Sequence, residues 1–312
     1  MTESKVRNDL AVRVAWLYHE HGLTQQDIAD RLGISRSTIS RVLTEAERDG
    51  IIRVVITQPL PEAARLAEAL IERFDLSSAV VGTNLDDEPP AHAAAAAMAR
   101  RLENIASSGS VTIAAGWGRT IALSAEATRP IPTTGVIIVD AFGHTTTDAT
   151  TAAVEVTNVL SRKFDARVVH VPSPGFAASA DVAESFMSSP PVARALDHAR
   201  DADVVVVSVG VTGASSLLID EGFMTVDSMD EVMEAGAVGE IFGRYFDADG
   251  ESVVADGLHP IALTIEDLRK ALRVIAVAGG AEKAGAIRGA LATGVLDELV
   301  VDETLAEALL AD

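Results

Sequence analysis

The stretch Leu23-Thr-Gln-Gln-Asp-Ile-Ala-Asp-Arg-Leu-Gly-Ile-Ser-Arg-Ser-Thr-Ile-Ser-Arg-Val-Leu43 decides the first part of the fold. Thr24 is a good helix N-cap, and Asp27, three residues later, can reach back towards the cap. Gly33 suits the left-handed residue that commonly ends a helix. These signals predict a short helix followed by a tight turn, with apolar residues at helical spacing: Ile28, Ala29 and Leu32.

A second helix is predicted directly after the turn, with Ser35 as its N-cap. One face is apolar at Ile39, Val42, Leu43 and Ala46. The opposite face carries hydroxyl groups and two guanidinium groups in its first two turns, which suits phosphates and base edges of the DNA major groove. We interpret the two helices as a helix-turn-helix; the alternative is an ordinary helical hairpin with a polar outer face. The predicted DNA-binding residues are Thr24, Gln25, Ser35, Arg36, Ser37, Thr38, Ser40 and Arg41.

The sequence on either side of this motif sets the predicted domain boundary. Residues 5–21 are expected to be helical, and residues 51–56 are expected to form a strand like the edge of a β-wing. Pro59 and Pro61 then close the first domain. We predict a winged helix-turn-helix DNA-binding domain over residues 1–58 and a second domain over residues 59–312, to which the loops and the resemblance described below assign effector binding and oligomerisation. The helix expected over residues 61–74 is a coupling helix, a dimer contact or part of the second core.

Composition limits the class of protein. The 312-residue chain is 48% hydrophobic, which is ample for a large core, and it has no cysteine. Disulfides and cysteine-based zinc sites are therefore excluded, and a reducing compartment is indicated. The opening Met-Thr-Glu-Ser-Lys does not resemble a signal peptide, and no apolar run reaches the roughly 18 residues of a membrane span. We expect a cytoplasmic protein with no membrane partner.

The net charge of −21 argues at first against a nucleic-acid partner, but it is unevenly distributed. Residues 1–58 hold eight Lys and Arg against eight Asp and Glu, whereas the remaining 254 residues hold 17 against 38. All of the excess acidity thus lies outside the predicted DNA-binding domain. We expect modest non-specific affinity for DNA and a need for oligomerisation to reach specific affinity.

Beyond residue 75 the sequence alternates between strand and helix patterns. Most of the strand-like runs are continuously apolar, as strands buried on both faces are. This alternation predicts an α/β domain with a Rossmann-like parallel sheet. Strands are expected at 79–82, 111–115, 136–139, 167–171, 204–209, 274–277 and 299–301, and helices at 91–106, 120–128, 151–163, 181–200, 228–235, 264–271, 281–292 and 303–311.

Four loops follow predicted strands and are expected to meet at one edge of the sheet, where open α/β sheets bind ligands. Gly116-Trp-Gly-Arg-Thr120 opens a helix, so its backbone N–H groups suit a phosphate, and Arg119 and Thr120 add a charge and a hydroxyl. Gly279-Gly-Ala-Glu-Lys283 offers Lys283 in the first helical turn. The other two loops are Asp140-Ala-Phe-Gly-His144 and Gly210-Val-Thr-Gly213. Asp140 and His144 either contribute to the site, or they only cap a helix or form hydrogen bonds within their own loop.

The glycine-rich stretch 236–250 holds one further candidate, Glu240, which can bind ligand hydroxyls. Asp247-Ala-Asp-Gly resembles a turn, and it lacks the ligand series and the final Glu of a calcium loop. The chain also has no Gly-x-x-x-x-Gly-Lys-Ser/Thr loop, so an NTPase is disfavoured. The sequence indicates no metal, no cofactor and no catalytic residues.

These motifs resemble the SorC family of sugar-binding bacterial transcription regulators, also called SorC/DeoR-like, along nearly the whole chain. The resemblance rests on the helix-turn-helix at 23–43, the Gly116–Thr120 loop, Gly236-Ala-Val-Gly-Glu-Ile-Phe-Gly243, Gly279-Gly-Ala-Glu-Lys283-Ala-Gly-Ala-Ile287 and Leu299-Val-Val-Asp-Glu303. It implies a second domain similar to sugar-phosphate isomerases and deaminases, a tetramer, and DNA binding that changes when a sugar or sugar phosphate binds.

Site roles follow from the same resemblance. Gly118, Arg119 and Thr120 would meet a phosphate together with Lys283, and Gly143, His144 and Glu240 would face the sugar. The Asp140–His144 loop has no Lys or Arg, so it cannot form a Schiff base, and one phosphate or none fits better than two. The predicted effector-binding residues are Gly116, Gly118, Arg119, Thr120, Asp140, Gly143, His144, Glu240, Gly279, Gly280 and Lys283.

The predicted function is a transcriptional regulator of a carbohydrate operon that binds double-stranded operator DNA and responds to a sugar or sugar phosphate. The alternative is a sugar-phosphate isomerase or deaminase with a DNA-binding arm. Such an enzyme needs an acid and a base over the sugar carbons, for which Asp140, His144 and Glu240 are the candidates. Turnover of a sugar phosphate by the purified protein would favour that alternative.

Overall fold

The computed structural model describes residues 3–48, 50–52, 61–85, 87–145, 153–254 and 256–311. It divides the chain into two compact units, Met1–Pro59 and Leu60–Asp312. In the described part, no helix combines the length and the apolar character that crossing a bilayer requires.

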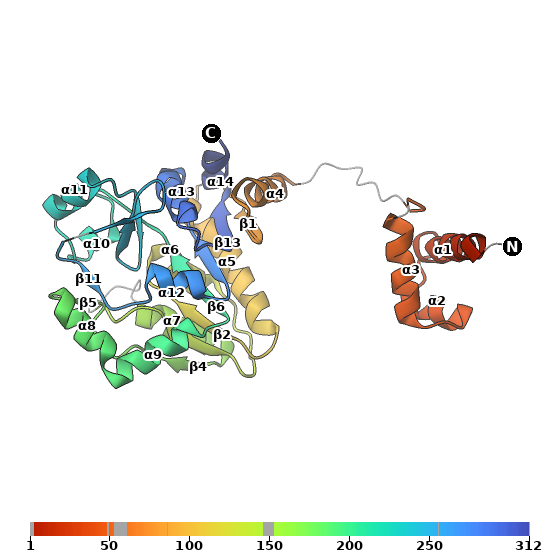
Figure 1. Cartoon of the computed structure of the whole chain (residues 1–312), viewed down its shortest axis with the longest axis horizontal. Helices are drawn as coiled ribbons and strands as arrows, with labels where there is room; N and C mark the ends of the chain where they lie inside the picture. The colour runs from red at the N-terminus through yellow and green to blue at the C-terminus, as the bar shows by residue number, and fades with distance from the viewer. Residues whose placement is uncertain are drawn as a thin grey trace. The chain divides into compact units, whose positions relative to one another are not determined.

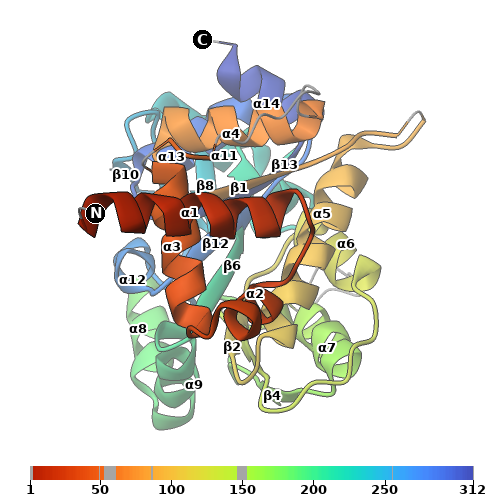
Figure 2. The same cartoon turned by 90° about the vertical axis from the view of Figure 1, so that its right-hand side faces the viewer.

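The first unit contains three helices, α1 (Glu3–His19), α2 (Gln25–Leu32) and α3 (Arg36–Arg48). Thr24 and Asp27 form the predicted capping box, and Gly33 ends α2 with φ 68°. Helix α1 crosses α3 and packs against it (Figure 2). The three helices share a core made of Ala11, Val14, Leu17, Ile28, Ala29, Ile39, Val42, Leu43 and Ala46.

This arrangement confirms the helix-turn-helix. The predicted wing strand is only partly covered by the structure: Ile51 and Ile52 lie in a bend instead of a strand, and residues 53–56 lie outside the described residues.

The second unit is built on a seven-stranded parallel sheet with the order β1-β13-β12-β6-β2-β3-β4. The sheet confirms the predicted α/β class. Every strand predicted for this unit is present, with small shifts at the ends: β1 (Ser78–Gly82), β2 (Thr112–Ala115), β3 (Ile137–Asp140), β4 (Arg167–Val169), β6 (Val204–Ser208), β12 (Val274–Val277) and β13 (Glu298–Asp302).

Helices cover both faces of this sheet (Figure 1). Successive strand residues point to opposite faces, so Ile113 and Ile138 join one apolar cluster while Ala114 and Val139 join the other. The first cluster is covered by α5 (Pro90–Ser107), α6 (Arg119–Ala127) and α7 (Ala153–Phe164). The second is covered by α4 (Glu62–Phe74), α9 (Pro190–Arg200), α13 (Ala284–Ala292) and α14 (Glu303–Leu310).

Helix α4 therefore belongs to the second core, which is one of the three interpretations of residues 61–74. Its apolar face buries Leu66 and Leu70, which are 2% and 0% exposed.

Two features differ from the prediction. The helix expected over 181–200 is two helices, α8 (Ala180–Ser188) and α9, because Ser189 precedes a proline and is held in the extended region at ψ 137°. The loops at 210–213 and 236–250 contain three strands of a small antiparallel sheet, β7 (Gly210–Val211), β8 (Gly239–Ile241) and β9 (Arg244–Phe246). The fourth strand, β10 (Ser252–Val253), follows directly after them.

The remaining elements are short. Strands β5 (Phe176–Ala177) and β11 (His259–Pro260) pair with each other. The other helices are α10 (Leu217–Asp220), α11 (Val226–Glu234), α12 (Ile265–Lys270) and the 3-10 turn η1 (Ala281–Lys283), which directly precedes α13.

Candidate functional site

The predicted DNA-binding face lies on the solvent side of α3. Arg36, Ser37, Ser40 and Arg41 are exposed, and Thr38 is half-buried. The buried side of the same helix holds its apolar residues in the three-helix core. The helix therefore presents two guanidinium groups and two hydroxyls to solvent within its first two turns.

Two of the predicted DNA-binding side chains also cap helices. The Thr24 hydroxyl donates to the Asp27 carboxylate at 2.6 Å and accepts the Asp27 backbone N–H at 3.2 Å. The Ser35 hydroxyl accepts the Thr38 N–H at 3.2 Å and lies 2.8 Å from the Thr38 hydroxyl. Their first role is to fix where α2 and α3 begin, which orients the exposed donors of α3.

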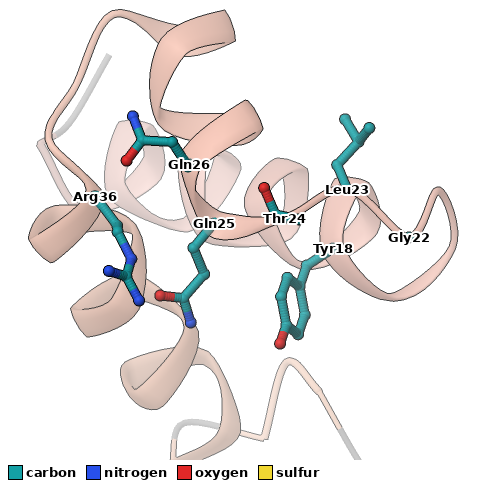
Figure 3. A pocket seen from close by; sticks show the side chains of 7 residues that line it. All are labelled: Tyr18, Gly22, Leu23, Thr24, Gln25, Gln26 and Arg36. Carbon is teal, nitrogen blue, oxygen red and sulfur yellow. The ribbon is translucent and has the colours of Figure 1, made fainter.

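A surface hollow links the starts of the two helices (Figure 3). The Gln25 and Arg36 side chains point in the same direction there, and the Tyr18 ring points that way too. Tyr18 is 38% exposed. A phenol, an amide and a guanidinium group all donate hydrogen bonds to phosphate oxygens, so this hollow suits the DNA backbone.

The second site lies at the carboxyl edge of the parallel sheet. A small cavity of about 40 Å³ is lined there by residues that follow β2, β6 and β12 and by one residue of β8. Four predicted effector-binding residues meet in its wall: Gly118, Arg119, Glu240 and Lys283. The cavity also borders the start of α6, whose first N–H groups suit an anion.

Gly118 is the residue that shapes this corner. Its φ of 132° is one that other residues rarely adopt, and a Cβ there would lie 3.1 Å from the Ser208 side chain. A larger residue would be strained and would press against the end of β6.

The Arg119 guanidinium is already engaged. It donates to the Ser215 carbonyl at 2.9 Å and to the Asp220 carboxylate at 3.2 Å. Both partners lie in the segment that carries Leu217 over the cavity. The Arg119 and Asp220 side chains are about half exposed, at 55% and 50%, so this ion pair is weak.

Two ionisable groups of opposite sign also line the cavity, the buried Glu240 and the half-buried Lys283. Burial raises the pKa of the Glu240 carboxyl to about 7, although the Gly243 N–H at 2.7 Å and the charge of Lys283 act to lower it. Burial and the nearby Arg119 lower the pKa of Lys283. A carboxyl group with this pKa can either donate or accept a hydrogen bond near neutral pH.

Four other predicted residues lie close by without lining the cavity. Thr120 is buried inside the first turn of α6. Gly116 and Gly279 are required by close packing, since a Cβ would meet the Phe242 ring at 2.4 Å and the Ala91 backbone at 2.6 Å. The Gly280 N–H donates to the Asp302 carboxylate at 2.8 Å.

The last three predicted residues form a separate group after β3. Asp140 is fully buried, and its Oδ2 lies 2.9 Å from His170 Nδ1 and 3.5 Å from His144 Nε2. Burial alone would raise the pKa of Asp140, but the neighbouring His144, His170 and Thr157 side chains hold it below the usual value. Gly143 packs against the Pro174 carbonyl. Phe142 of this loop stacks on Trp117 of the cavity wall, with ring centroids 5.3 Å apart.

Comparison with known proteins gives two family matches. The family described as "Putative sugar-binding domain" matches residues 58–311, and a Crp-like helix-turn-helix domain matches residues 12–69. The transcriptional regulator LsrR of Klebsiella pneumoniae is 30% identical over 97% of this chain and 93% of its own. The erythritol catabolism regulatory protein EryD of Brucella abortus is 28% identical over 97% of this chain and 96% of its own.

The chain belongs to the SorC family of sugar-binding transcriptional regulators. The solved structure of the full-length sorbitol operon regulator SorC from Klebsiella pneumoniae shares the fold, with a TM-score of 0.71 and 24% identity over 97% of this chain and 98% of that one. Like the relatives named above, this SorC-family protein is a DNA-binding transcriptional regulator. It is not an enzyme. The isomerase or deaminase alternative is not supported.

The sequence missed several residues that this SorC-family regulator places at its two sites. Trp117, Ser208 and Leu217 line the cavity at the carboxyl edge of the sheet, and Tyr18 lines the hollow beside α2. Ser208 is the last residue of β6. Its position at the carboxyl end of a predicted strand could have identified it as a site residue, because ligands bind at that edge of an open α/β sheet. His170 approaches Asp140 only because β3 and β4 are paired, and no local pattern shows that pairing.

Proposed function

We propose that this SorC-family regulator acts in the cytoplasm as a homo-oligomer, with a tetramer as the expected state, and controls an operon of carbohydrate metabolism. Its operator contacts come from the exposed face of α3 and the start of α2, that is, from Thr24, Gln25, Ser35, Arg36, Ser37, Thr38, Ser40 and Arg41. One such surface reads only one half-site, and symmetric pairs of copies read two.

The effector site is the carboxyl edge of the sheet. The observation that carries this proposal is the meeting of Gly118, Arg119, Glu240 and Lys283 in one wall. Two cations and the N–H groups that open α6 suit one anionic group, and Glu240 suits a hydroxyl. The combination fits a singly phosphorylated sugar or a polyol. A relative named for erythritol catabolism and another named a deoxyribonucleoside regulator, in Bacillus subtilis, support a small carbohydrate as the class.

The cavity must enlarge to accept such a molecule. About 40 Å³ has room for only a few waters, each of which needs about 10–15 Å³ of such space. The segment from Gly213 to Gly222 closes the cavity by placing Leu217 in its wall and by binding Arg119 through Ser215 and Asp220. We propose that the effector's anionic group replaces Asp220 as the partner of Arg119, which couples binding to movement of this segment.

Thermal unfolding of the full chain against sugars, polyols and their phosphates tests the effector proposal. A ligand at about 100 times its dissociation constant should stabilise the protein by about 2.7 kcal/mol. With a phosphorylated sugar, Lys283→Ala should abolish the shift, because the anion loses a half-buried cation. Lys270→Ala, which removes an exposed lysine of α12, is the matched control and should leave the shift intact.

A shift with a free sugar or polyol alone would keep the effector site and remove the phosphate from the proposal. A shift that survives Lys283→Ala undiminished would place the ligand elsewhere. The absence of any shift would leave the effector site without support.

Releasing Arg119 tests the coupling directly. Asp220→Ala should raise the affinity for a phosphorylated effector by up to about fivefold, because an exposed ion pair is worth about 0–1 kcal/mol. Isothermal titration measures the change. Asp230→Ala removes an exposed acid of α11 and should leave the affinity unchanged. Weaker binding in Asp220→Ala would show that Asp220 holds the pocket in its binding form.

A further inference from the structure

Three potential metal ligands converge beyond the ends of β3 and β4. Asp140 is the last residue of β3, His170 comes directly after β4, and His144 lies in the loop after β3. One ligand atom from each lies within 4.8 Å of the other two. The sequence gives no sign of this group, because the three residues share no motif spacing.

The distances fit metal coordination. Asp140 Oδ2 is 2.9 Å from His170 Nδ1 and 3.5 Å from His144 Nε2. Two ligands bound tetrahedrally to zinc at about 2.0–2.2 Å stand roughly 3.3–3.6 Å apart, a range that includes the longer of these two values. Small side-chain rotations would therefore bring all three atoms onto one ion.

Hydrogen bonds from neighbouring groups hold the carboxylate in place. The Thr157 hydroxyl donates to Asp140 Oδ1 at 2.6 Å, and the Val171 N–H donates to Asp140 Oδ2 at 3.1 Å. Metal sites in proteins commonly have such outer partners, which orient the ligands.

The loop that carries His144 is fixed as well. The His144 N–H donates to the Ser173 carbonyl at 2.8 Å, and the Gly175 N–H donates to the His144 carbonyl at 2.6 Å. Two of the three ligands therefore come from, or directly follow, strands of the central sheet, and the third lies in a loop tied down on both sides.

Two features of the group remain unsatisfied without an ion. His144 Nε2 is buried and makes no hydrogen bond of good geometry among the described residues, since Asp140 Oδ2 lies 3.5 Å away, at the limit for such a bond. Asp140 is a fully buried carboxylate whose ion-pair partners in the described part of the chain are these two histidines, with no Lys or Arg. A dication would bind the unpartnered nitrogen and offset the buried negative charge.

We propose that Asp140, His144 and His170 bind one divalent transition-metal ion of the zinc class. Two imidazoles and one carboxylate are a ligand set for such ions and leave at least one coordination position open. The two histidine side chains are 36% and 31% exposed, so the ion and a further oxygen ligand can enter from solvent. The alternative is a purely hydrogen-bonded cluster in which His170 donates to Asp140.

Zinc titration of the full chain tests the proposal. The protein is prepared without a polyhistidine tag, treated with a chelator and titrated in competition with a chromogenic chelator. One zinc ion per chain is expected. His144→Gln and His170→Gln should each weaken binding by more than about 100-fold, since losing even an outer partner costs 10–100-fold. Thr157→Val, which removes only an outer partner, should weaken binding by about 10–100-fold.

His198→Gln is the matched control, because His198 is an exposed histidine of α9, and it should bind zinc like the unaltered chain. Cobalt provides a readout that needs no variant. Proton NMR of the cobalt-loaded chain should show paramagnetically shifted ring resonances from two histidines. No zinc binding, affinity unchanged in both His144→Gln and His170→Gln, or no coordinated histidine in the cobalt form would overturn the proposal.

Discussion

Arg36→Ala and Arg41→Ala are each expected to abolish specific operator binding at working concentrations. Both guanidinium groups are exposed in the first two turns of α3, where a recognition helix meets base edges and phosphates. Each lost contact should cost about 1–3 kcal/mol. Since a symmetric pair of copies makes each contact twice, the expected loss per operator is about 2–6 kcal/mol. Fluorescence anisotropy with an operator fragment measures it.

Salt dependence separates the roles of the two arginines. Arg36 lies beside Gln25 in the hollow that suits the DNA backbone (Figure 3), so its loss should lower the salt slope by about one per contact and weaken all sequences alike. Arg41 lies further along α3, and its loss should relax sequence preference at one position of each half-site.

The matched control for charge is Arg13→Ala, which removes an exposed arginine of α1 outside the predicted contacts. It should retain nearly full operator affinity. Effector binding should persist in all three variants. If Arg36→Ala and Arg41→Ala still protect the operator like the unaltered protein, α3 is not the recognition helix.

The local parts of the fold could be predicted because their causes are local. The Thr24 and Asp27 box, the φ of 68° at Gly33 and the apolar stripe of α3 all follow from residues a few positions apart. The parallel sheet was also predictable, because β6 and β12 are continuous apolar runs.

Other features depend on short elements or on distant contacts. The strands β7 and β8 have two and three residues and contain glycine, so no alternating pattern marks them. The break at Ser189 was visible in the two prolines that follow it, yet the helical periodicity continues across it.

The candidate site likewise has a part that could be predicted from local sequence and a part that depends on distant contacts. The loops after β2 and β12 were predicted to meet, and Gly118, Arg119 and Lys283 do meet in one wall. Gly143 and His144 were predicted to face the sugar, and Asp140 was assigned to the same effector site; their binding of a ligand stays a prediction, and the structure brings Asp140 and His144 together with His170. That contact joins residues 30 positions apart in the sequence and requires the β3–β4 pairing.

Glu240→Gln is expected to remove a large pH dependence of stability. The pKa of Glu240 rises from 4.5 to about 7 on folding, chiefly through burial. The native state therefore holds this proton more tightly than the unfolded state, so the contribution of Glu240 is fully favourable below pH 4.5. It is lost as the pH rises from 4.5 to about 7. At about 1.4 kcal/mol per pKa unit, the loss is about 3 kcal/mol at pH 8.

Glutamine keeps the shape and an oxygen that can accept the Gly243 N–H, but it does not ionise. Relative to the unaltered chain, Glu240→Gln should thus gain stability between pH 4.5 and pH 8. The chain has two tryptophans, Trp16 in the first unit and Trp117 in the second. Urea unfolding followed by fluorescence in a Trp16→Phe background therefore reports the second unit, because Trp117 is buried there at 5% exposure.

Glu234→Gln, at an exposed position of α11, is the control and should follow the unaltered chain at every pH. If Glu240→Gln also runs parallel to the unaltered chain from pH 4.5 to pH 8, Glu240 is ionised throughout, and Lys283 compensates its burial. In that case the effector would meet a fixed ion pair. If the two curves diverge as expected, the effector meets a carboxyl group that is neutral below pH 7 and donates a hydrogen bond, so its affinity for an ionised phosphate oxygen, which can only accept, should fall as Glu240 ionises.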